Sequence, residues 1–129
     1  MNVIIVEDEP LAREVLESHL SNVPGTKHIA SFSNAMEAGE FLSKEKVDLI
    51  LLDIQMPSLS GLEFVKTLSQ PPKIVFTTAY PKYAVEGFEL NAVDYLVKPV
   101  SFERFYKAIQ KVKNSLGKTE QDQSEEEEY

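Results

Sequence analysis

The chain has 129 residues, no cysteine and a net charge of −8, which suits a single domain with a substantial core. The lack of cysteine excludes disulfide frameworks, thiolate metal sites and thiol catalysis. The acidic balance argues against a nucleic-acid-binding surface on this chain, because phosphates require a basic face.

No segment has the features of a targeting signal or a membrane anchor. Residues 1–6 lack the basic flank of a signal peptide and are followed at once by acids. No apolar run approaches the roughly 20 residues that a membrane span needs. We therefore expect a soluble cytoplasmic protein that makes no contact with membranes.

The first third of the chain alternates short apolar runs with helical patterns. Residues 2–6 predict a buried strand that ends in acids, and Pro10 suits the first turn of a helix that ends near residue 23. A short second strand is expected at 29–32. Ser33 or Asn34 can then cap a helix over residues 35–42.

Residues 47–57 form the most informative stretch. Leu49 to Leu52 are apolar at successive positions, and Asp53 follows them directly. A central parallel strand, buried on both faces, has this pattern, although a short buried helix has a similar one. The Pro, Ser and Gly residues at 57–61 favour a short strand that stops near Asp53.

The second half continues the alternation. A helix over 62–68 ends before Pro71, a fourth strand is expected over 73–77, and residues 81–90 predict a helix that Gly87 weakens. A fifth strand over 92–97 leads into Lys98, and Ser101 can cap a final helix that ends near residue 116. Residues 117–129 contain six acids and one base, so we expect a disordered tail or the start of an interdomain linker.

About five strand-helix units in alternation predict the fold class. The expected fold is a doubly wound α/β fold with a five-stranded parallel sheet of order 2-1-3-4-5, which is flavodoxin-like. That order places the ends of strands one and three side by side, so Glu7, Asp8 and Asp53 should meet at one sheet edge. Thr78 and Lys98 follow the fourth and fifth strands.

A cluster of three carboxylates favours a divalent cation. Two like charges 4 Å apart repel by roughly 4 kcal/mol at an effective dielectric constant near 20. Oxygen ligands favour Mg²⁺ or Ca²⁺, and a site partly open to water and phosphate suits Mg²⁺. Carboxylates, a metal, a lysine and a threonine hydroxyl together are the parts of phosphoryl transfer to a carboxylate.

Four motifs resemble the response-regulator receiver domain of two-component signalling. They occur in the family's order and at compatible spacing, and the resemblance covers residues 1–116. The motifs are Val6-Glu7-Asp8-Glu9-Pro10, Leu51-Leu52-Asp53-Ile54-Gln55-Met56-Pro57 with Gly61, Thr78-Ala79, and Tyr95-Leu96-Val97-Lys98-Pro99.

The resemblance implies a role for each site residue. Asp53 would accept the phosphoryl group, and Asp8 would bind Mg²⁺ directly. Glu7 would act on the metal through water, and Gln55 would offer its backbone carbonyl. Lys98 would pair with the phosphoryl group, next to a cis bond to Pro99.

The resemblance also implies a switch formed by Thr78 and Tyr95. The Thr78 hydroxyl would be drawn to the phosphoryl oxygens, and Tyr95 would turn inward into the vacated space. Thr77 is a rival hydroxyl, but a strand neighbour should point the other way. Simple core packing is the alternative role for Tyr95.

The segment from Phe76 to Tyr95 resembles the receivers that precede LytTR-type DNA-binding domains. That resemblance implies a sensor histidine kinase as phosphoryl donor and transcriptional control through a C-terminal domain that this chain lacks. It also allows a homodimer through the 81–90 helix, the fifth strand and the last helix. A stand-alone receiver is the alternative.

Two other functions compete with the receiver hypothesis. A small haloacid-dehalogenase-like phosphatase also uses a strand-end aspartate, but it needs a second aspartate where this chain has Gln55, and it needs a cap domain. A pure interaction module without a working switch is the other reading, and the intact site residues argue against it. We expect a signalling receiver that catalyses only its own phosphorylation and dephosphorylation.

Overall fold

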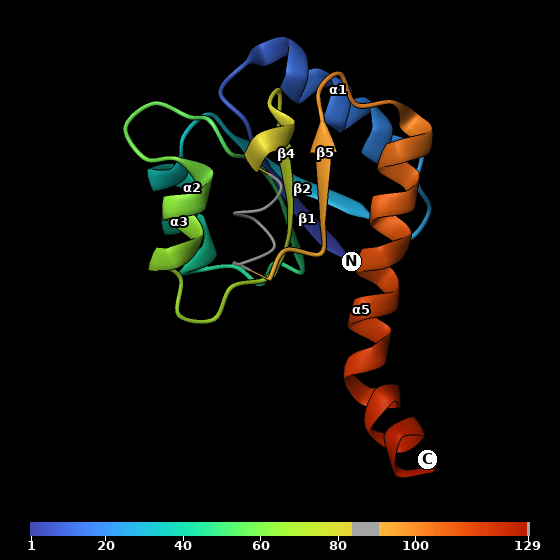
Figure 1. The fold of residues 1–129 in the computed structure, drawn as a ribbon. Coiled ribbons are helices and arrows are strands. Elements are labelled where there is room, and N and C mark those ends of the chain that lie inside the picture. Colours follow the sequence, from blue (N-terminus) through green and yellow to red (C-terminus); the bar gives the residue numbers. More distant parts are fainter. Residues whose placement is uncertain (84–90, 129) are drawn as a thin grey trace.

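A computed structural model of the chain describes residues 1–83 and 91–128, with the backbone alone at 83 and 118–128 (Figure 1). Five parallel strands form one sheet of order β2-β1-β3-β4-β5. This confirms the predicted doubly wound fold and its strand order. The strands are β1 (Asn2–Val6), β2 (Lys27–Phe32), β3 (Leu49–Asp53), β4 (Lys73–Thr78) and β5 (Asp94–Val97).

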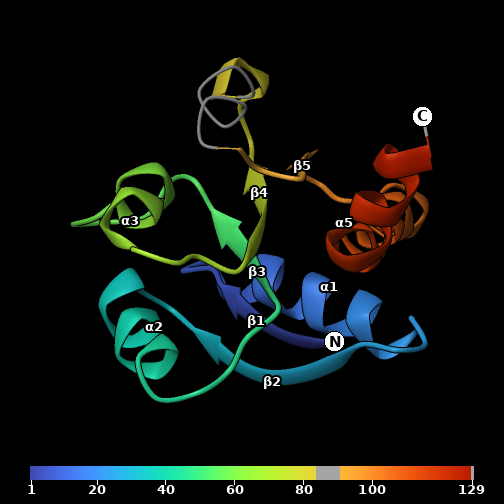
Figure 2. The same cartoon turned by 90° about the horizontal axis from the view of Figure 1, so that it is seen from below.

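Helices cover both faces of the sheet. Figure 2 shows α1 and α5 on one face, and α2 and α3 on the other. The 81–90 helix expected from the sequence starts as a 3-10 turn, η1, and its remainder at 84–90 lies outside the described residues. The described helices are α1 (Pro10–Ser21), α2 (Ala35–Leu42), α3 (Gly61–Thr67), η1 (Pro81–Tyr83) and α5 (Phe102–Glu128).

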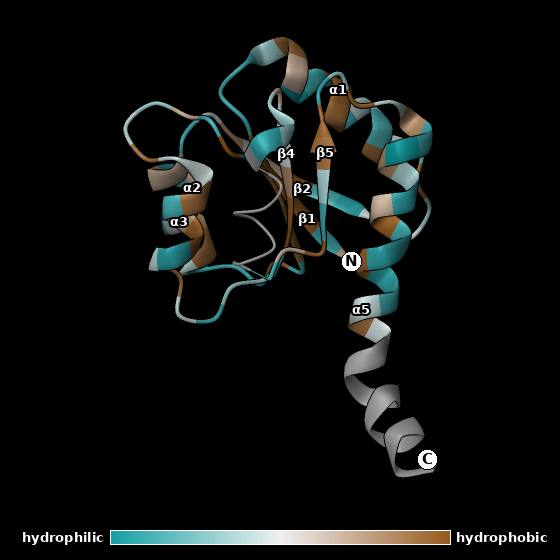
Figure 3. Cartoon of the chain, viewed as in Figure 1, coloured by the Kyte–Doolittle hydropathy of each residue, from teal (hydrophilic) through white to brown (hydrophobic). Residues whose placement is uncertain are grey.

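The central strand β3 is buried along its whole length. Leu49 and Leu51 pack with α1 and α5, whereas Ile50 and Leu52 pack with α2 and α3. Two apolar clusters therefore sandwich the sheet. Brown, hydrophobic residues lie along its inner strands in Figure 3, whereas the edge strand β2 is largely teal. A strand with helices on both faces needs apolar side chains at successive positions, which explains the continuous run in the sequence.

The helix starts follow the capping residues in the sequence. Asn34 accepts a hydrogen bond from the Glu37 N–H at 2.9 Å, and Ser101 Oγ accepts one from the Arg104 N–H at 3.2 Å. Ser60 and Glu63 form a reciprocal capping box at the start of α3. Pro10 occupies the first turn of α1, as expected.

The turn after β3 depends on a glycine. The Gly61 N–H donates to the Ile54 carbonyl at 2.8 Å, and this brings the start of α3 against the end of β3. A Cβ atom at residue 61 would collide with the Asp53 carbonyl oxygen. Only glycine allows this approach, so the turn fixes the backbone that carries Asp53.

The end of the chain differs from its prediction. A disordered tail was expected from residue 117, but α5 continues as a helix to Glu128 and extends past the sheet in Figure 1. The segment has no proline and is rich in Glu and Gln, which are good helix formers, so the helix can continue through it. Its role as an interdomain linker stays a prediction. Within the described residues, no helix is both long and apolar enough to cross a membrane.

Candidate functional site

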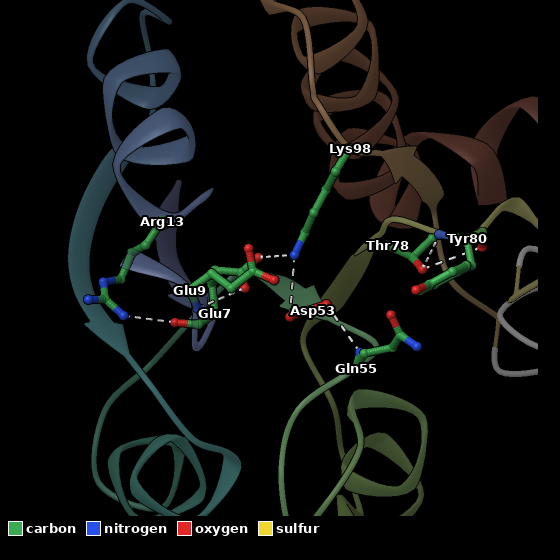
Figure 4. Close-up of polar contacts among 8 residues, drawn as sticks. All are labelled: Glu7, Glu9, Arg13, Asp53, Gln55, Thr78, Tyr80 and Lys98. Carbon is green, nitrogen blue, oxygen red and sulfur yellow. Dashed lines mark hydrogen bonds and ion pairs between the residues drawn. The ribbon is translucent and has the colours of Figure 1, made fainter. Parts of the chain in front are cut away.

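Three parallel strands deliver their polar residues to one edge of the sheet. Glu7 and Asp8 follow β1, Asp53 ends β3, and Lys98 follows β5. β1 and β3 are hydrogen-bonded neighbours, which brings Glu7, Asp8 and Asp53 together as the strand order predicts. Figure 4 shows Lys98 reaching across from the β5 side toward Glu7 and Asp53.

Asp53 is 2% exposed, and its two carboxylate oxygens have different partners. Oδ1 accepts a hydrogen bond from the Gln55 N–H at 3.1 Å. Oδ2 lies 3.4 Å from Lys98 Nζ (Figure 4). The carboxylate is therefore held on one side by the turn after β3 and on the other side by a cation.

Glu7 is fully buried and forms the shorter ion pair with Lys98. Its Oε1 lies 2.8 Å from Lys98 Nζ, and its Oε2 accepts a hydrogen bond from the Glu9 N–H at 3.2 Å. Arg13 on α1 donates to the Glu7 backbone carbonyl at 2.8 Å. The lysine thus bridges two buried acids from different strands, with Glu7 as its nearer partner.

The electrostatics of the site favour a cation. The pKa of Asp53 is raised from 3.8 to about 8, first because the carboxyl is buried, and then because Glu7 shares a hydrogen bond with it and repels its charge. Lys98 and the Gln55 N–H act in the opposite direction. Burial by itself would lower the pKa of Lys98, but its hydrogen bond to Glu7 and the charges of Asp53 and Glu7 hold that pKa above its ordinary value.

The acidic residues at this edge fit a magnesium ion. Glu7, Asp8 and Asp53 each offer a carboxylate oxygen, and these oxygens lie within 4.8 Å of one another. Asp8 Oδ1 is buried and has no hydrogen-bond partner among the described residues. A buried oxygen without a donor is costly unless a ligand binds it, and hard oxygen donors suit Mg²⁺.

The two threonines at the end of β4 point to opposite faces of the sheet. Thr78 Oγ1 accepts a hydrogen bond from the Tyr80 N–H at 3.0 Å, so its hydroxyl faces the loop after β4 (Figure 4). Thr77 pairs with Asp53 in the strand register, and its buried hydroxyl has no hydrogen-bond partner in the described part of the chain. It lines a cavity of about 360 Å³ together with Glu7, Lys98 and apolar residues of α1.

Tyr95 on β5 is buried, with 8% of its surface exposed. Its ring packs against Phe76 with a centroid separation of 5.7 Å. The residue before it, Asp94, binds Arg104 of α5 through two contacts of 2.7 and 2.8 Å and lies 3.4 Å from Lys111 Nζ. This ion-pair group ties β5 to α5 next to the proposed switch residue.

The comparisons with known proteins agree with this arrangement. Residues 3–110 match the family model described as the response regulator receiver domain. The chain belongs to this family. Its members are signalling proteins of two-component systems rather than enzymes in the usual sense, and the sequence-based identification as a receiver is thereby confirmed.

The curated relatives include named regulatory proteins. The chain is 41% identical over 119 residues to the sensory transduction protein LytR of Staphylococcus haemolyticus, covering 90% of this chain and 46% of that protein. It is 44% identical over 115 residues to the positive alginate biosynthesis regulatory protein of Pseudomonas aeruginosa, covering 86% and 46%. The resemblance to receivers of LytTR-type regulators is borne out by these relatives. The chain spans about half the length of the curated relatives that it matches.

Solved structures show the same fold. The response regulatory domain of MrkE from Klebsiella pneumoniae superposes with a TM-score of 0.82 at 39% identity, covering 89% of this chain and 97% of that one. The response regulator TrrA of Thermotoga maritima, solved in complex with Mg²⁺-BeF, gives a TM-score of 0.75 at 31% identity, covering 86% and 97%.

The structure brings together the side chains of four predicted residues, whereas two others have side-chain contacts elsewhere. Glu7, Asp8, Asp53 and Lys98 form one cluster, and Gln55 joins it through its backbone N–H. The Lys98–Pro99 bond is cis, as expected. Thr78 and Tyr95 lie on the α2/α3 side and make other contacts. Sequence reasoning missed Arg13, whose contact is with a backbone carbonyl and has no motif of its own.

Proposed function

We propose that this chain is a phosphorylation-controlled switch in which Asp53 accepts a phosphoryl group from a histidine of a sensor kinase. The observation that carries the proposal is the buried Asp53 carboxylate, with a lysine at 3.4 Å and two further acids around it. An Asp53 oxygen attacks the phosphorus, the phosphorus–nitrogen bond breaks, and the kinase imidazole leaves with the electron pair.

Each side chain has a defined part in that transfer. Lys98 neutralises negative charge that gathers beside Asp53, and Glu7 holds the lysine there through their 2.8 Å contact. Asp8 and Asp53 would hold Mg²⁺ together with the Gln55 carbonyl, and Glu7 would act through water. Bound there, Mg²⁺ would offset the charge of the phosphoryl oxygens. The Thr78 hydroxyl would leave Tyr80 to bind a phosphoryl oxygen, with Tyr95 filling the space.

The decisive experiment is phosphorylation of purified protein by acetyl phosphate in Mg²⁺. We expect one phosphoryl group per chain in the wild type and none in Asp53→Asn, because an amide cannot serve as the acceptor. Asp48→Asn is the matched control, since Asp48 lies at the opposite end of the same strand and accepts a hydrogen bond from the Asn2 N–H. Label retained on Asp53→Asn would refute the assignment, and labelling that persists in EDTA would refute the role of Mg²⁺.

The whole protein's output is a second part of the proposal. Because the LytR and alginate-regulator relatives are about twice as long as this chain, we infer that the receiver controls a LytTR-type DNA-binding domain beyond residue 129, in the cytoplasm. The full reading frame tests this inference. A basic, strand-rich extension supports it, whereas a frame that ends near Tyr129 favours a stand-alone receiver.

A further inference from the structure

His19 connects α1 to the loop between β5 and α5. Its Nε2 atom lies 2.8 Å from the Val100 carbonyl oxygen. A carbonyl oxygen only accepts, so Nε2 carries the hydrogen and donates it. The imidazole packs against Phe102 and Phe105, with centroid separations of 5.5 and 5.3 Å. The ring is therefore held in a defined orientation toward the loop.

The loop that His19 binds carries Lys98. At its start, the Lys98 N–H donates to the Thr78 carbonyl at 2.8 Å, and at its end Ser101 caps α5. Pro99 has no N–H to donate. Within the described residues, the bond from His19 to Val100 is the hydrogen bond that ties this loop to α1.

The same helix also holds the other partner of the ion pair. Arg13 donates to the Glu7 carbonyl at 2.8 Å, six residues before His19. Two side chains of α1 thus bind the main-chain carbonyls of the two segments whose side chains, Glu7 and Lys98, meet at 2.8 Å. Through these contacts α1 sets the position of one segment relative to the other.

We propose that His19 is a positioning residue for Lys98, acting through its hydrogen bond to the Val100 carbonyl. The inference rests on the proposed role of Lys98 in phosphoryl transfer to Asp53. Without the bond, apolar packing of Val100 still connects the loop to α1, but no hydrogen bond among the described residues fixes the loop's orientation relative to α1. The 3.4 Å contact between Lys98 Nζ and Asp53 then becomes less well fixed. Charge stabilisation depends steeply on such placement.

Two variants of His19 separate the hydrogen bond from packing. His19→Gln keeps a nitrogen donor at a similar reach, whereas His19→Leu keeps an apolar side chain and loses the donor. His28→Leu is the matched control, because His28 contacts Ser31 and Glu17 away from the site. The measurements are the rate of Asp53 phosphorylation by acetyl phosphate at saturating Mg²⁺, and the Mg²⁺ affinity.

We expect His19→Leu to be slowed by about tenfold, the scale of an outer-shell orienting contact. His19→Gln and His28→Leu should stay near the wild-type rate. Mg²⁺ affinity should be unchanged in all three variants, because the acids are untouched. A wild-type rate in His19→Leu, an equal slowing in His19→Gln, or a parallel loss of Mg²⁺ affinity would each overturn the inference.

Two further measurements keep the test decisive. The ¹⁵N spectrum of the wild-type protein should show the Nε2–H tautomer of His19, and an Nδ1–H tautomer overturns the inference without any variant. Lys98→Ala is the reference for the proposed function. If it reacts at the wild-type rate, the role of Lys98 fails; if it is slow while His19→Leu is not, only the role of His19 fails.

Discussion

Asp53 is a carboxyl group that the fold makes costly to ionise. It is 2% exposed and lies beside Glu7, so burial and the charge of Glu7 both oppose its negative form. Lys98 offsets only part of this effect, because its nearer contact is with Glu7. A cation that binds here would lower the cost of ionising Asp53. Metal binding and the ionisation of Asp53 are therefore linked.

The first prediction concerns the stability of the metal-free protein. The pKa of Asp53 lies at about 8 in the folded chain and at 3.8 ordinarily, so between these values the folded state holds a proton that the unfolded chain releases. The binding of this proton stabilises the folded state, and that stabilisation is lost as the pH rises from about 4 to 8. We expect Asp53→Asn to raise Tm by about 5 °C at pH 8 in EDTA, and by less at pH 4.5. Thermal denaturation at the two pH values checks this.

Asp48→Asn serves as the control for that prediction. Asp48 is outside the acidic cluster, so its substitution should show no gain that depends on pH in this way. An Asp53→Asn variant with the same Tm as the wild type at pH 8 would contradict the cost that we assign to the buried carboxyl.

Thr78 and Tyr95, the two proposed switch residues, make different contacts in the structure. Thr78 Oγ1 accepts a hydrogen bond from the Tyr80 N–H, and in the proposed switch it would give up that bond to bind a phosphoryl oxygen. Tyr95 already packs on Phe76 inside the α2/α3 cluster. The buried position agrees with both readings of Tyr95, core packing and an inward switch position, and its switch role stays a prediction.

At the scale of elements, the turn between β3 and α3 determines where Asp53 points. The Gly61 N–H binds the Ile54 carbonyl, and the chain passes against the Asp53 backbone at a distance that excludes a side chain. The capping box of Ser60 and Glu63 then starts α3 at once. A short helix and a strand end thereby hold each other in place.

The second prediction follows from that turn. Gly61→Ala places a Cβ atom on the Asp53 carbonyl oxygen, so the backbone must move, at a cost of about 2 to 4 kcal/mol in the free energy of unfolding. Because the displaced backbone carries the acceptor, phosphorylation should also slow. Gly117→Ala is the control, since a Cβ there meets nothing within 4 Å and alanine favours the helix. Urea denaturation measures the free energy of unfolding of the two variants, and equal values would contradict the prediction.

The third prediction concerns the connection of β5 to α5. Arg104 and Lys111 hold the pKa of Asp94 below its ordinary value although burial by itself would raise it. The ionised Asp94 therefore stabilises the fold above about pH 4, and this stabilisation is lost as the pH falls. Arg104→Met should destabilise the fold by about 1 to 3 kcal/mol at pH 7, and by less at pH 3.

Lys107→Met is the matched control for Arg104→Met, because Lys107 is exposed on the same helix. Chemical denaturation at pH 7 and pH 3 gives the loss of unfolding free energy, relative to the wild type, for each of the two variants. A loss of stability that is equal at both pH values would show that Arg104 acts through packing rather than through Asp94.

At the scale of the whole molecule, β5 and α5 form the described part of the surface proposed for a homodimer. Val97 and Tyr106 are exposed there, at 44% and 43%. The proposed acceptor Asp53 lies at the end of the same sheet, so a change at Thr78 and Tyr95 on phosphorylation would reach this surface through β5.

Sedimentation gives the fourth prediction. We expect the wild type to shift toward a dimer in Mg²⁺ and beryllofluoride, and Asp53→Asn to sediment alike with and without them. If the wild type remains a monomer under both conditions, the homodimer prediction is wrong. Indifference of both proteins to beryllofluoride, with no Mg²⁺ effect, would favour the pure interaction module instead.

The sequence by itself determined the fold, the strand order and the main acidic cluster. Alternating buried strands and amphipathic helices leave few topologies, and acids at the ends of neighbouring parallel strands must meet. The motifs around Asp53 and Lys98 were enough to identify the family. These features depend on local pattern and on a topology that the pattern implies.

The tertiary structure decided the features that depend on distances between remote residues. Lys98 lies closer to Glu7 than to Asp53, Arg13 binds the Glu7 carbonyl, and His19 reaches Val100, 81 residues away. The raised pKa of Asp53 follows from burial and from Glu7 together, and neither can be read from composition. The structure also differs from the predicted end of the last helix near residue 116, since α5 continues to Glu128. Residues with high helix propensity can stay helical where apolar contacts end.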